Sequence, residues 1–282
     1  MLADPSYLEA SLRAYYGSVE RIVLSYDETG TSWTGTPLPV RQCLEIARTI
    51  DVDRKCVEVP GRFARPGADP LESETIQRQH ALDAASSFGK WVLQLDTDEV
   101  MLSADTFFAS LRAADGADAG GLDFPARWLY TRVGTRRYLE QTDRFWRRAA
   151  SYPGPLAVRA GTRLKLARQA DVQLFRVDFR RTNTDPWHPA DAQVDTVIPA
   201  DESVVHFSWV RQPEVIRRKF RWSGHTEDMK PPQVYRRWEW RTRHPRVTVA
   251  LTPLRARSRA WYRLSTIPEP PGGVPIHVEY EP

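Results

Sequence analysis

Three carboxylates stand close together in the segment KWVLQLDTDEV, residues 90–100. Residues 91–95 have the apolar pattern of a buried strand, and Asp96, Asp98 and Glu99 follow directly. Along an extended chain, Asp96 and Asp98 point to the same side. Such a pair suits a hard cation such as Mg²⁺ or Mn²⁺, which keeps coordination sites for phosphate oxygens and helps a diphosphate to leave. The alternative is that both aspartates only shape a turn or cap the next helix.

The segments around these carboxylates alternate between strand and helix patterns. Strands are predicted at 20–26, 55–60, 91–95 and 121–130. Helices are predicted between them, with N-caps, prolines or glycines at their ends, at 4–16, 36–50, 69–88 and 103–115. This alternation predicts βαβ units and the α/β class, with a mostly parallel sheet flanked by helices. Sheets of this kind bind ligands beyond the carboxyl ends of their strands, where Asp96 and Asp98 are expected.

The second half of the chain has weaker patterns. Short strands and turns are predicted for 131–180, a Pro- and Asp-rich loop for 181–202, and a strand for 203–210. A helix starting near Pro213 follows, and from about residue 229 the composition shifts to Arg, Trp and Pro. We therefore predict one domain over residues 1–228 and a basic, aromatic C-terminal extension over 229–282 with its own packing.

Composition limits the class of protein. The chain has 282 residues, a net charge of +4, and 41% hydrophobic and 27% charged residues, as in ordinary globular proteins. It has no apolar run long enough to span a bilayer, and its first residues lack the pattern of a signal peptide. Cys43 and Cys56 fit no zinc or redox motif, which predicts reduced thiols in a cytoplasmic protein. The excess of Arg over Lys is typical of a GC-rich bacterial genome.

The segment RQHALDAASSFGKWVLQLDTDEV, residues 78–100, resembles the approach to the Asp-x-Asp motif of GT-A-fold glycosyltransferases of the family 2 type. Those enzymes show an arginine, then AL..A, then W(V/I)L.LD.DE. The resemblance extends upstream through RIVLSYDETGTSW, residues 21–33, and downstream to HFSWV, residues 206–210. It covers about residues 1–225 and implies a GT-A, Rossmann-like fold over the first domain, which would bind the nucleotide sugar and carry out catalysis.

The resemblance also implies roles for the residues that carry it. Asp96 would hold the ribose or the metal, and Asp98 would be the direct ligand of Mn²⁺ or Mg²⁺. His206 would be a third ligand or a diphosphate contact, where the alternative is a core histidine bonded to the backbone. Glu99 is expected to support the loop.

Two further positions would serve the nucleotide. Asp27 would contact the base or the ribose, and Arg78 would reach the pyrophosphate or the base. The alternatives are a turn residue in DETG for Asp27 and an exposed helical arginine for Arg78.

Two departures from the family pattern stand out. The family's first strand should precede MLADPSYL and is missing, so either the natural start lies upstream or the sheet is one strand short. The Glu-Asp or His-Glu pair that often supplies the catalytic base is also missing. Asp185 and Asp191, in TDPWHPADAQ, stand at about the right distance, and we choose Asp191, although a loop-forming role fits either one. Trp187 in the same loop is a candidate for stacking on a sugar.

The leading hypothesis is a metal-dependent, inverting glycosyltransferase that moves a sugar from a nucleotide-diphosphate donor to a glycan or lipid-linked acceptor. A haloacid-dehalogenase-like phosphatase using Asp96 and Asp98 is the alternative enzyme, although Glu99-Val100 replaces the small pair usual there. A non-enzymatic protein that binds membrane or nucleic acid through the Arg-rich tail is the third hypothesis. The tail also allows peripheral contact with the inner face of a membrane, whereas nucleic acid is not expected as a partner of the transferase.

Overall fold

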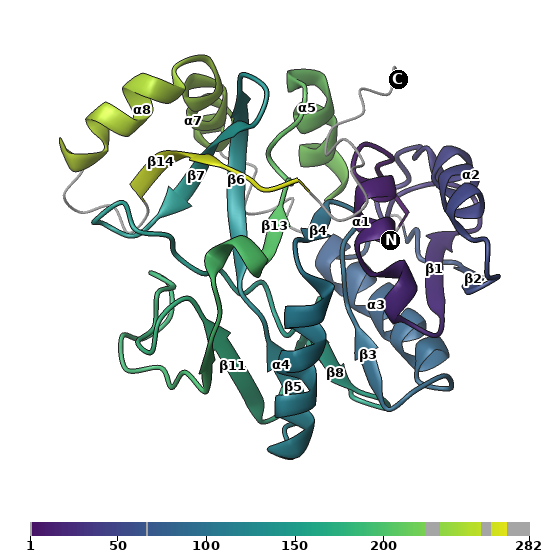
Figure 1. The fold of residues 1–282 in the computed structure, drawn as a ribbon. Coiled ribbons are helices and arrows are strands. Elements are labelled where there is room, and N and C mark those ends of the chain that lie inside the picture. The colour runs from purple at the N-terminus through teal and green to yellow at the C-terminus, as the bar shows by residue number, and fades with distance from the viewer. Residues whose placement is uncertain (1, 66, 224–231, 255–260, 270–282) are drawn as a thin grey trace.

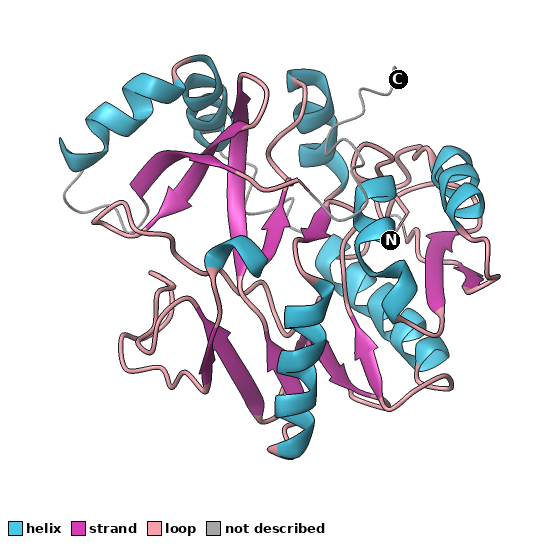
Figure 2. Ribbon diagram, in the orientation of Figure 1, coloured by secondary structure: helices cyan, strands magenta, loops and turns pink. Residues whose placement is uncertain are grey.

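The computed structural model describes residues 2–65, 67–223, 232–254 and 261–269 and has the expected α/β class (Figures 1 and 2). Its first part comprises α1 (Leu8–Tyr15), β1 (Ile22–Asp27), α2 (Val40–Ile50) and β2 (Cys56–Gly61). β1 and β2 pair in parallel over their whole lengths. Apolar side chains of α1 and α2 pack on β1 in one buried cluster, so this part forms a small core of its own.

The next two helices begin where the sequence predicts. α3 (Pro70–Ala85) is capped by Asp69, whose side chain accepts a hydrogen bond from the Leu71 amide at 3.0 Å. α4 (Ala104–Gly116) is capped by Ser103, which accepts one from the Thr106 amide at 3.2 Å. Both caps satisfy amides that the first turn of a helix leaves without a partner.

Two mixed five-stranded sheets follow. The first has the order β12 (Thr196–Val197), β11 (Leu174–Asp178), β5 (Gly121–Asp123), β8 (Ala157–Arg159) and β3 (Trp91–Leu93). The second has the order β14 (Trp261–Thr266), β7 (Arg137–Thr142), β6 (Ala126–Val133), β13 (Val204–His206) and β4 (Glu99–Met101). A short hairpin joins β9 (Leu164–Leu166) and β10 (Gln169–Ala170).

The pairing is parallel only in places. β1 with β2, β5 with β11, β11 with β12 and β6 with β13 are parallel. β8 runs antiparallel to both β3 and β5, and β4 runs antiparallel to β13. The expectation of a mostly parallel sheet therefore holds for part of the molecule only.

The strand predicted at 121–130 is two strands. Pro125 separates β5 from β6, and the two strands belong to different sheets. Proline has no amide hydrogen and fixes its own φ, so an uninterrupted strand across this position is disfavoured. The main core lies beside this break and includes Phe107, Leu122, Leu129 and Phe207, all fully buried.

The described part of 229–282 adds an edge strand to the second sheet and packs its helices against that sheet. It contains α7 (Pro232–Arg243), α8 (Pro245–Leu251) and β14, and it follows α5 (Pro213–Trp222). β14 pairs with β7 over six residues, from Trp261 to Thr266. Trp238 is buried against β6 and β7, and its indole donates a hydrogen bond to the Trp209 carbonyl at 2.9 Å. Arg255, Arg257 and Arg259 of the predicted basic tail lie outside the described residues.

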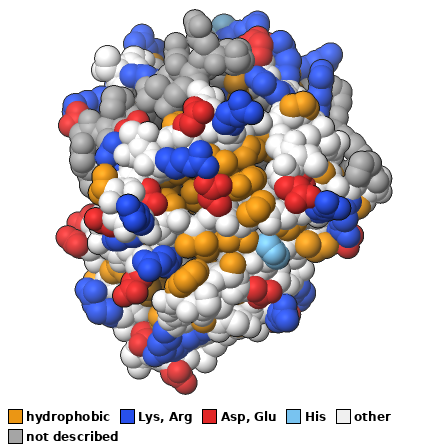
Figure 3. All heavy atoms as spheres, turned by 90° about the vertical axis from the view of Figure 1, so that its right-hand side faces the viewer, with side chains coloured by type: hydrophobic (Ala, Val, Ile, Leu, Met, Phe, Trp, Pro, Cys, Tyr) orange, Lys and Arg blue, Asp and Glu red, His pale blue; other side chains and the backbone are white. Residues whose placement is uncertain are grey.

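Every helix among the described residues is too short or too polar to cross a lipid bilayer. Figure 3 shows the side of the molecule on which α2, β1 and β2 lie. Hydrophobic side chains cross the middle of this face, and charged side chains surround them.

Candidate functional site

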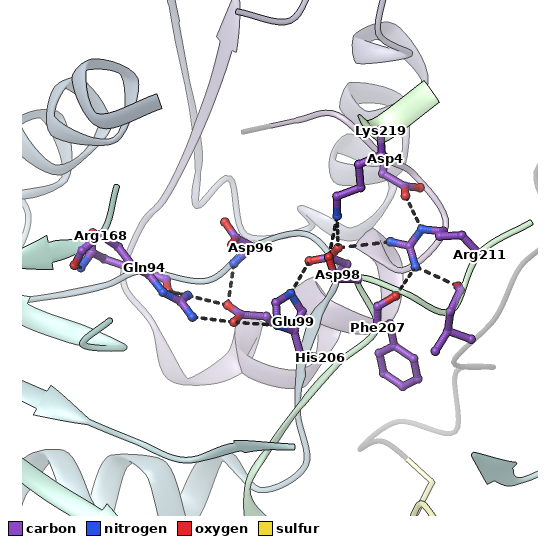
Figure 4. A network of polar contacts seen from close by, with 12 residues as sticks. Asp4, Gln94, Asp96, Asp98, Glu99, Arg168, His206, Phe207, Arg211 and Lys219 are labelled. Atoms are coloured by element: carbon purple, nitrogen blue, oxygen red, sulfur yellow. Dashed lines mark hydrogen bonds and ion pairs between the residues drawn. The ribbon is translucent and has the colours of Figure 1, made fainter. Parts of the chain in front are cut away.

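The predicted Asp-x-Asp motif forms the tight connection between β3 and β4. The Asp96 amide donates to the Glu99 carboxylate at 3.0 Å, and the Glu99 amide donates to the Asp96 carbonyl at 3.0 Å. Glu99 already belongs to β4, where it lies opposite His206 of β13. The turn therefore brings Asp96, Asp98, Glu99 and His206 into one network (Figure 4).

Glu99 anchors this turn. Its carboxylate is fully buried and binds both Nη atoms of Arg168 at 2.7 Å. Arg168 also donates to the Gln94 carbonyl at 3.0 Å, so one guanidinium links both ends of the loop. A buried carboxylate is stable only with such partners, and the bidentate pair is the strongest form of this contact. These contacts give Glu99 the supporting role that we expected from the sequence.

Asp98 is buried and surrounded by basic groups. Its Oδ2 lies 3.1 Å from Lys219 Nζ and 3.4 Å from Arg211 Nη2, and its Oδ1 lies 3.4 Å from His206 Nε2. Burial raises the pKa of this carboxyl group, but Lys219, His206 and Arg211 outweigh it and hold the pKa well below its ordinary value. Asp98 is therefore a carboxylate at all ordinary pH values.

The arginine that holds Asp98 is itself fixed. Arg211 Nε donates to Asp4 at 2.5 Å, and Nη1 donates to the carbonyls of Phe207 and Val210. Its guanidinium also lies 4.1 Å from the centre of the Tyr7 ring. Arg211 thus joins the segment before α1 to the end of β13.

Asp96 lies nearer the surface than Asp98. Its Oδ1 accepts from Arg78 Nη2 at 2.7 Å, and Arg78 also binds Glu74 one turn earlier in α3. Burial raises the pKa of Asp96. The charges of Arg78 and Arg168 lower this pKa by more than burial raises it, so the net shift is downward. The side chains of Asp96, Lys219 and Arg78 are 29%, 21% and 19% exposed, so a ligand can reach them.

His206 contacts Asp98 through its Nε2 nitrogen. Its Nε2 faces Asp98, whereas its Nδ1 is buried, lies 4.0 Å from Glu99 and has no hydrogen-bond partner among the described residues. The Trp128 ring packs against the imidazole edge to face at 5.3 Å. The structure therefore places His206 beside Asp98, as expected for a residue of the same site.

Two predicted site residues lie apart from these contacts. Asp27 accepts hydrogen bonds from the amides of Phe63, Ala64 and Thr29, so its oxygens hold the loop after β2 in place. Burial raises the pKa of Asp27, and these hydrogen bonds together with the Thr29 hydroxyl outweigh it and lower the pKa overall. Asp191 is exposed in the loop between β11 and β12 and makes no contact with the network.

The arrangement of the expected ligands does not fit a bound Mn²⁺ or Mg²⁺. No three His, Cys, Asp or Glu side chains of the described residues converge on a point that a metal would occupy. Lys219 and Arg211 neutralise Asp98, and Arg78 neutralises Asp96. A divalent cation would have to displace these groups, so we derive no chemical step through a metal.

The network contains residues that the sequence alone did not single out. Lys219, Arg211 and Arg168 are separated from Asp98 or Glu99 by 69 to 121 positions, and only the tertiary structure brings them together. The one available signal for Lys219 and Arg211 is their proximity in sequence to the HFSWV segment.

A second polar cluster lies in the loop after β11. His188 Nδ1 is 2.8 Å from Asp185 Oδ2, and Asp185 also accepts from the Trp187 amide. Trp187, the predicted stacking residue, is 60% exposed. Burial raises the pKa of nearby Asp123, and Arg176, His188 and Arg168 counteract it only in part.

Comparisons with protein-family models, with curated proteins and with solved structures find no match to this chain.

Proposed function

We propose that this protein is a glycosyltransferase that moves a sugar from a nucleotide-diphosphate sugar to a glycan or lipid-linked acceptor. The single observation that supports this most is the network at the carboxyl end of β3. There Asp96 and Asp98 meet His206, Arg78 and Lys219 in one partly open site. The proposal also rests on the resemblance of residues 78–100 to the Asp-x-Asp segment of GT-A-fold enzymes.

The accessible groups suit the two halves of such a donor. Arg78 and Lys219 present cations from α3 and α5, and a diphosphate is the anion that such a pair recognises. Asp96, the most exposed carboxylate of the motif, is placed to accept hydrogen bonds from ribose hydroxyls. The buried groups Glu99, Arg168 and Arg211 keep this surface rigid, which limits the entropy cost of orienting the donor.

The proposed reaction is a single displacement. An acceptor hydroxyl attacks the anomeric carbon, the bond from that carbon to the diphosphate oxygen breaks, and the hydroxyl proton passes to a carboxylate base. Asp191 is the proposed base because it is exposed in the loop that also carries Asp185 and Trp187. Direct displacement inverts the anomeric centre.

Thermal shift with UDP, GDP and their sugar conjugates tests the donor site. Each nucleotide is added with Mn²⁺, with Mg²⁺ and with a chelator. We expect a nucleotide diphosphate to raise the melting temperature of the wild-type protein and not that of Asp96→Asn. The matched control is Asp171→Asn, whose side chain is 78% exposed and directly follows β10. Equal shifts in Asp96→Asn and wild type would contradict the proposed site.

Release of UDP or GDP from the sugar conjugate tests the chemistry. Turnover that requires Asp191 and survives in Asp171→Asn is the expected result. Release of inorganic phosphate from a phosphomonoester by the same carboxylates would instead favour the phosphatase alternative.

A further inference from the structure

The helix α8 has an apolar exposed face and a polar buried face. Its exposed apolar side chains are those of Val247, Ala250 and Leu251, and Leu254 follows in the turn η3 (Thr252–Leu254), where it is 79% exposed. Spacings of three and four residues place these side chains on one side of the helix. Thr248 and Thr252 are buried. A helix on the surface of a globular protein normally has the reverse pattern, with its polar face toward water.

The buried face fixes the orientation of α8. The Thr248 hydroxyl donates to the His244 carbonyl at 3.0 Å, and the Thr252 hydroxyl donates to the Thr248 carbonyl at 2.7 Å. Both hydroxyls are thus satisfied within the helix, so their burial leaves no polar group unpaired. Val249 packs against the buried cluster that contains Trp238. These contacts direct the apolar face of α8 toward solvent.

A second exposed apolar element lies in the loop that follows β7. Phe145 is 56% exposed, and the neighbouring Trp146 is exposed as well. Asp143 accepts hydrogen bonds from the amides of Phe145 and Arg147 at 2.8 and 3.0 Å, which gives the turn a defined shape. Trp146 has a φ of 55°, a left-handed conformation that is uncommon for residues other than glycine. The loop therefore presents two aromatic side chains to solvent in a fixed position.

Both elements contact β14. The Trp261 ring lies 4.7 Å from the Trp146 ring, and Arg263 donates to the Trp146 carbonyl at 3.2 Å. α8 and η3 also pack against β14. In Figure 1, α8, the start of β14 and the end of β7 lie together at the upper left, on the opposite side from β1 and β2. We call this surface the apolar end, and it is formed by Phe145, Trp146, Val247, Leu251 and Leu254.

Basic side chains flank the apolar end. Residues 232–254 contain five arginines and one glutamate, which gives a net charge of +4, as large as that of the whole chain. Arg243 and Arg246 are exposed where α7 meets α8. In the loop after β7, the guanidinium groups of Arg144 and Arg147 lie 4.9 and 4.8 Å from the centre of the Phe145 ring. The surface thus combines exposed apolar side chains with a local excess of positive charge.

An anionic lipid surface fits this combination better than other partners. Arginines attract anionic headgroups, and apolar and aromatic side chains are stabilised at the boundary between headgroups and acyl chains. A nucleic acid would engage the arginines through its phosphates and leave Leu251 and Leu254 without a role. A second copy of the chain would bring two positively charged surfaces together, which is unfavourable.

We propose that the apolar end is a docking surface for a membrane that contains anionic lipids. Phe145, Leu251 and Leu254 enter the headgroup region, and Arg144 and Arg246 contact the anionic headgroups. β14, which both elements contact, keeps α8 and the loop after β7 in a fixed relation. The inference goes beyond the proposed transferase activity and does not depend on it, because docking requires neither donor nor acceptor.

Sedimentation with lipid vesicles tests the docking surface. The probes are vesicles of equal parts phosphatidylcholine and phosphatidylglycerol, and vesicles of phosphatidylcholine alone, at about 0.1 M salt. We expect the wild-type protein to bind the mixed vesicles at least about tenfold more tightly than the neutral vesicles, because several arginines face the headgroups. Failure of the wild type to bind the mixed vesicles would overturn the proposal.

The double variant Leu251→Gln/Leu254→Gln tests the apolar contribution. It should bind the mixed vesicles about tenfold or more weakly than wild type, because two leucine side chains no longer leave water. Both side chains are exposed, so urea unfolding should show an unchanged free energy of unfolding. The matched control is Val52→Gln/Leu166→Gln, which alters exposed apolar residues after α2 and in β9 and should bind like wild type.

The double variant Arg144→Gln/Arg246→Gln tests the basic contribution. It should weaken binding to the mixed vesicles about twentyfold, at about fivefold for each arginine near an anionic surface. The matched control is Arg41→Gln/Arg112→Gln, which removes two exposed arginines of α2 and α4 and the same net charge. Equal losses in the variant and this control would overturn the proposal, because the whole charge of the protein and not this surface would then govern binding.

Two further results would assign the surface to another partner. Vesicle binding by Leu251→Gln/Leu254→Gln that equals wild type would overturn the proposal, and unchanged binding of the same variant to a DNA oligonucleotide would then favour nucleic acid. A wild-type dimer in sedimentation velocity that this variant dissociates would assign the surface to contact between copies, and this would also overturn the proposal.

Discussion

Asp98→Asn is the most informative single change, because Asp98 joins three parts of the chain. Its carboxylate is contacted by Lys219 of α5, by Arg211 after β13 and by His206 of β13. Asparagine keeps the size of the side chain and removes the charge. Any loss of stability would then come from the lost ion pairs and not from a cavity left by a smaller side chain.

The expected cost follows from what remains after the change. Removing one partner of a buried ion pair costs about 3–5 kcal/mol when the other charge is left alone. Here Arg211 keeps Asp4 and two carbonyls, and Lys219 keeps Ser208 and is 21% exposed. We therefore expect Asp98→Asn to lower the free energy of unfolding by about 2–3 kcal/mol, below the usual range. For a domain of this size the melting temperature should fall by roughly 4–12 °C.

The pH dependence gives an independent check with a defined sign. The pKa of Asp98 is lowered well below its ordinary value of 3.8, so its contribution to stability is present above that value. The contribution is lost as the pH falls below 3.8 toward the pKa of the folded state. Asparagine does not titrate. The difference in the free energy of unfolding between wild type and Asp98→Asn should therefore be constant near neutral pH and should become smaller as the pH falls below 3.8.

Urea unfolding from about pH 7 down to about pH 2 measures both quantities. Asp171→Asn is again the control, since its exposed pair with Lys165 should contribute less than about 1 kcal/mol. The reasoning is refuted if Asp98→Asn unfolds at the same urea concentration as the control. It is also refuted if the gap to wild type stays constant throughout the acid range.

Two further changes test the cap of α4 and the competition for Asp98. Ser103→Ala removes the N-cap and should cost about 1 kcal/mol in urea unfolding, and an effect no larger than that of the exposed Ser87→Ala would contradict this. Lys219→Met removes the ammonium group 3.1 Å from Asp98 Oδ2 and should tighten Mn²⁺ binding measured by calorimetry. The control Lys165→Met should leave the affinity for Mn²⁺ unchanged. Equal affinities of wild type, Lys219→Met and Lys165→Met would show that Lys219 does not compete with a metal.

Much of the first half of the fold is predictable because its signals are local. The apolar run before Asp96, the caps Asp69 and Ser103, and the glycines near the helix ends all act within a few residues of their own position. The structure has the predicted helices α3 and α4 and strands β1 and β2 within a few residues of the expected ends. Residues 121–130 were predicted as one strand, although Pro125 within them interrupts the pairing and leaves β5 and β6 as separate strands.

The sequence predicts where the site lies in the fold but not all of the residues that form it. The sequence indicates that Asp96 and Asp98 follow a strand, and this is where the structure has them. Arg78 and His206, which the resemblance also singled out, do contact Asp96 and Asp98. The sequence contains no local signal for Lys219, Arg211 and Arg168, which complete the network. Asp27 shows the same limit, because its partners Phe63 and Ala64 belong to the loop after the neighbouring strand.

The sequence by itself determined the α/β class, the elements up to α4, and an acidic turn after β3, since periodicity and capping depend on neighbours in the chain. The tertiary structure alone decided that Lys219 and Arg211, 121 and 113 positions away, neutralise Asp98. It also decided that β1 and β3 stand apart. Such pairings depend on how separate elements pack, and no short-range pattern of residue types records that.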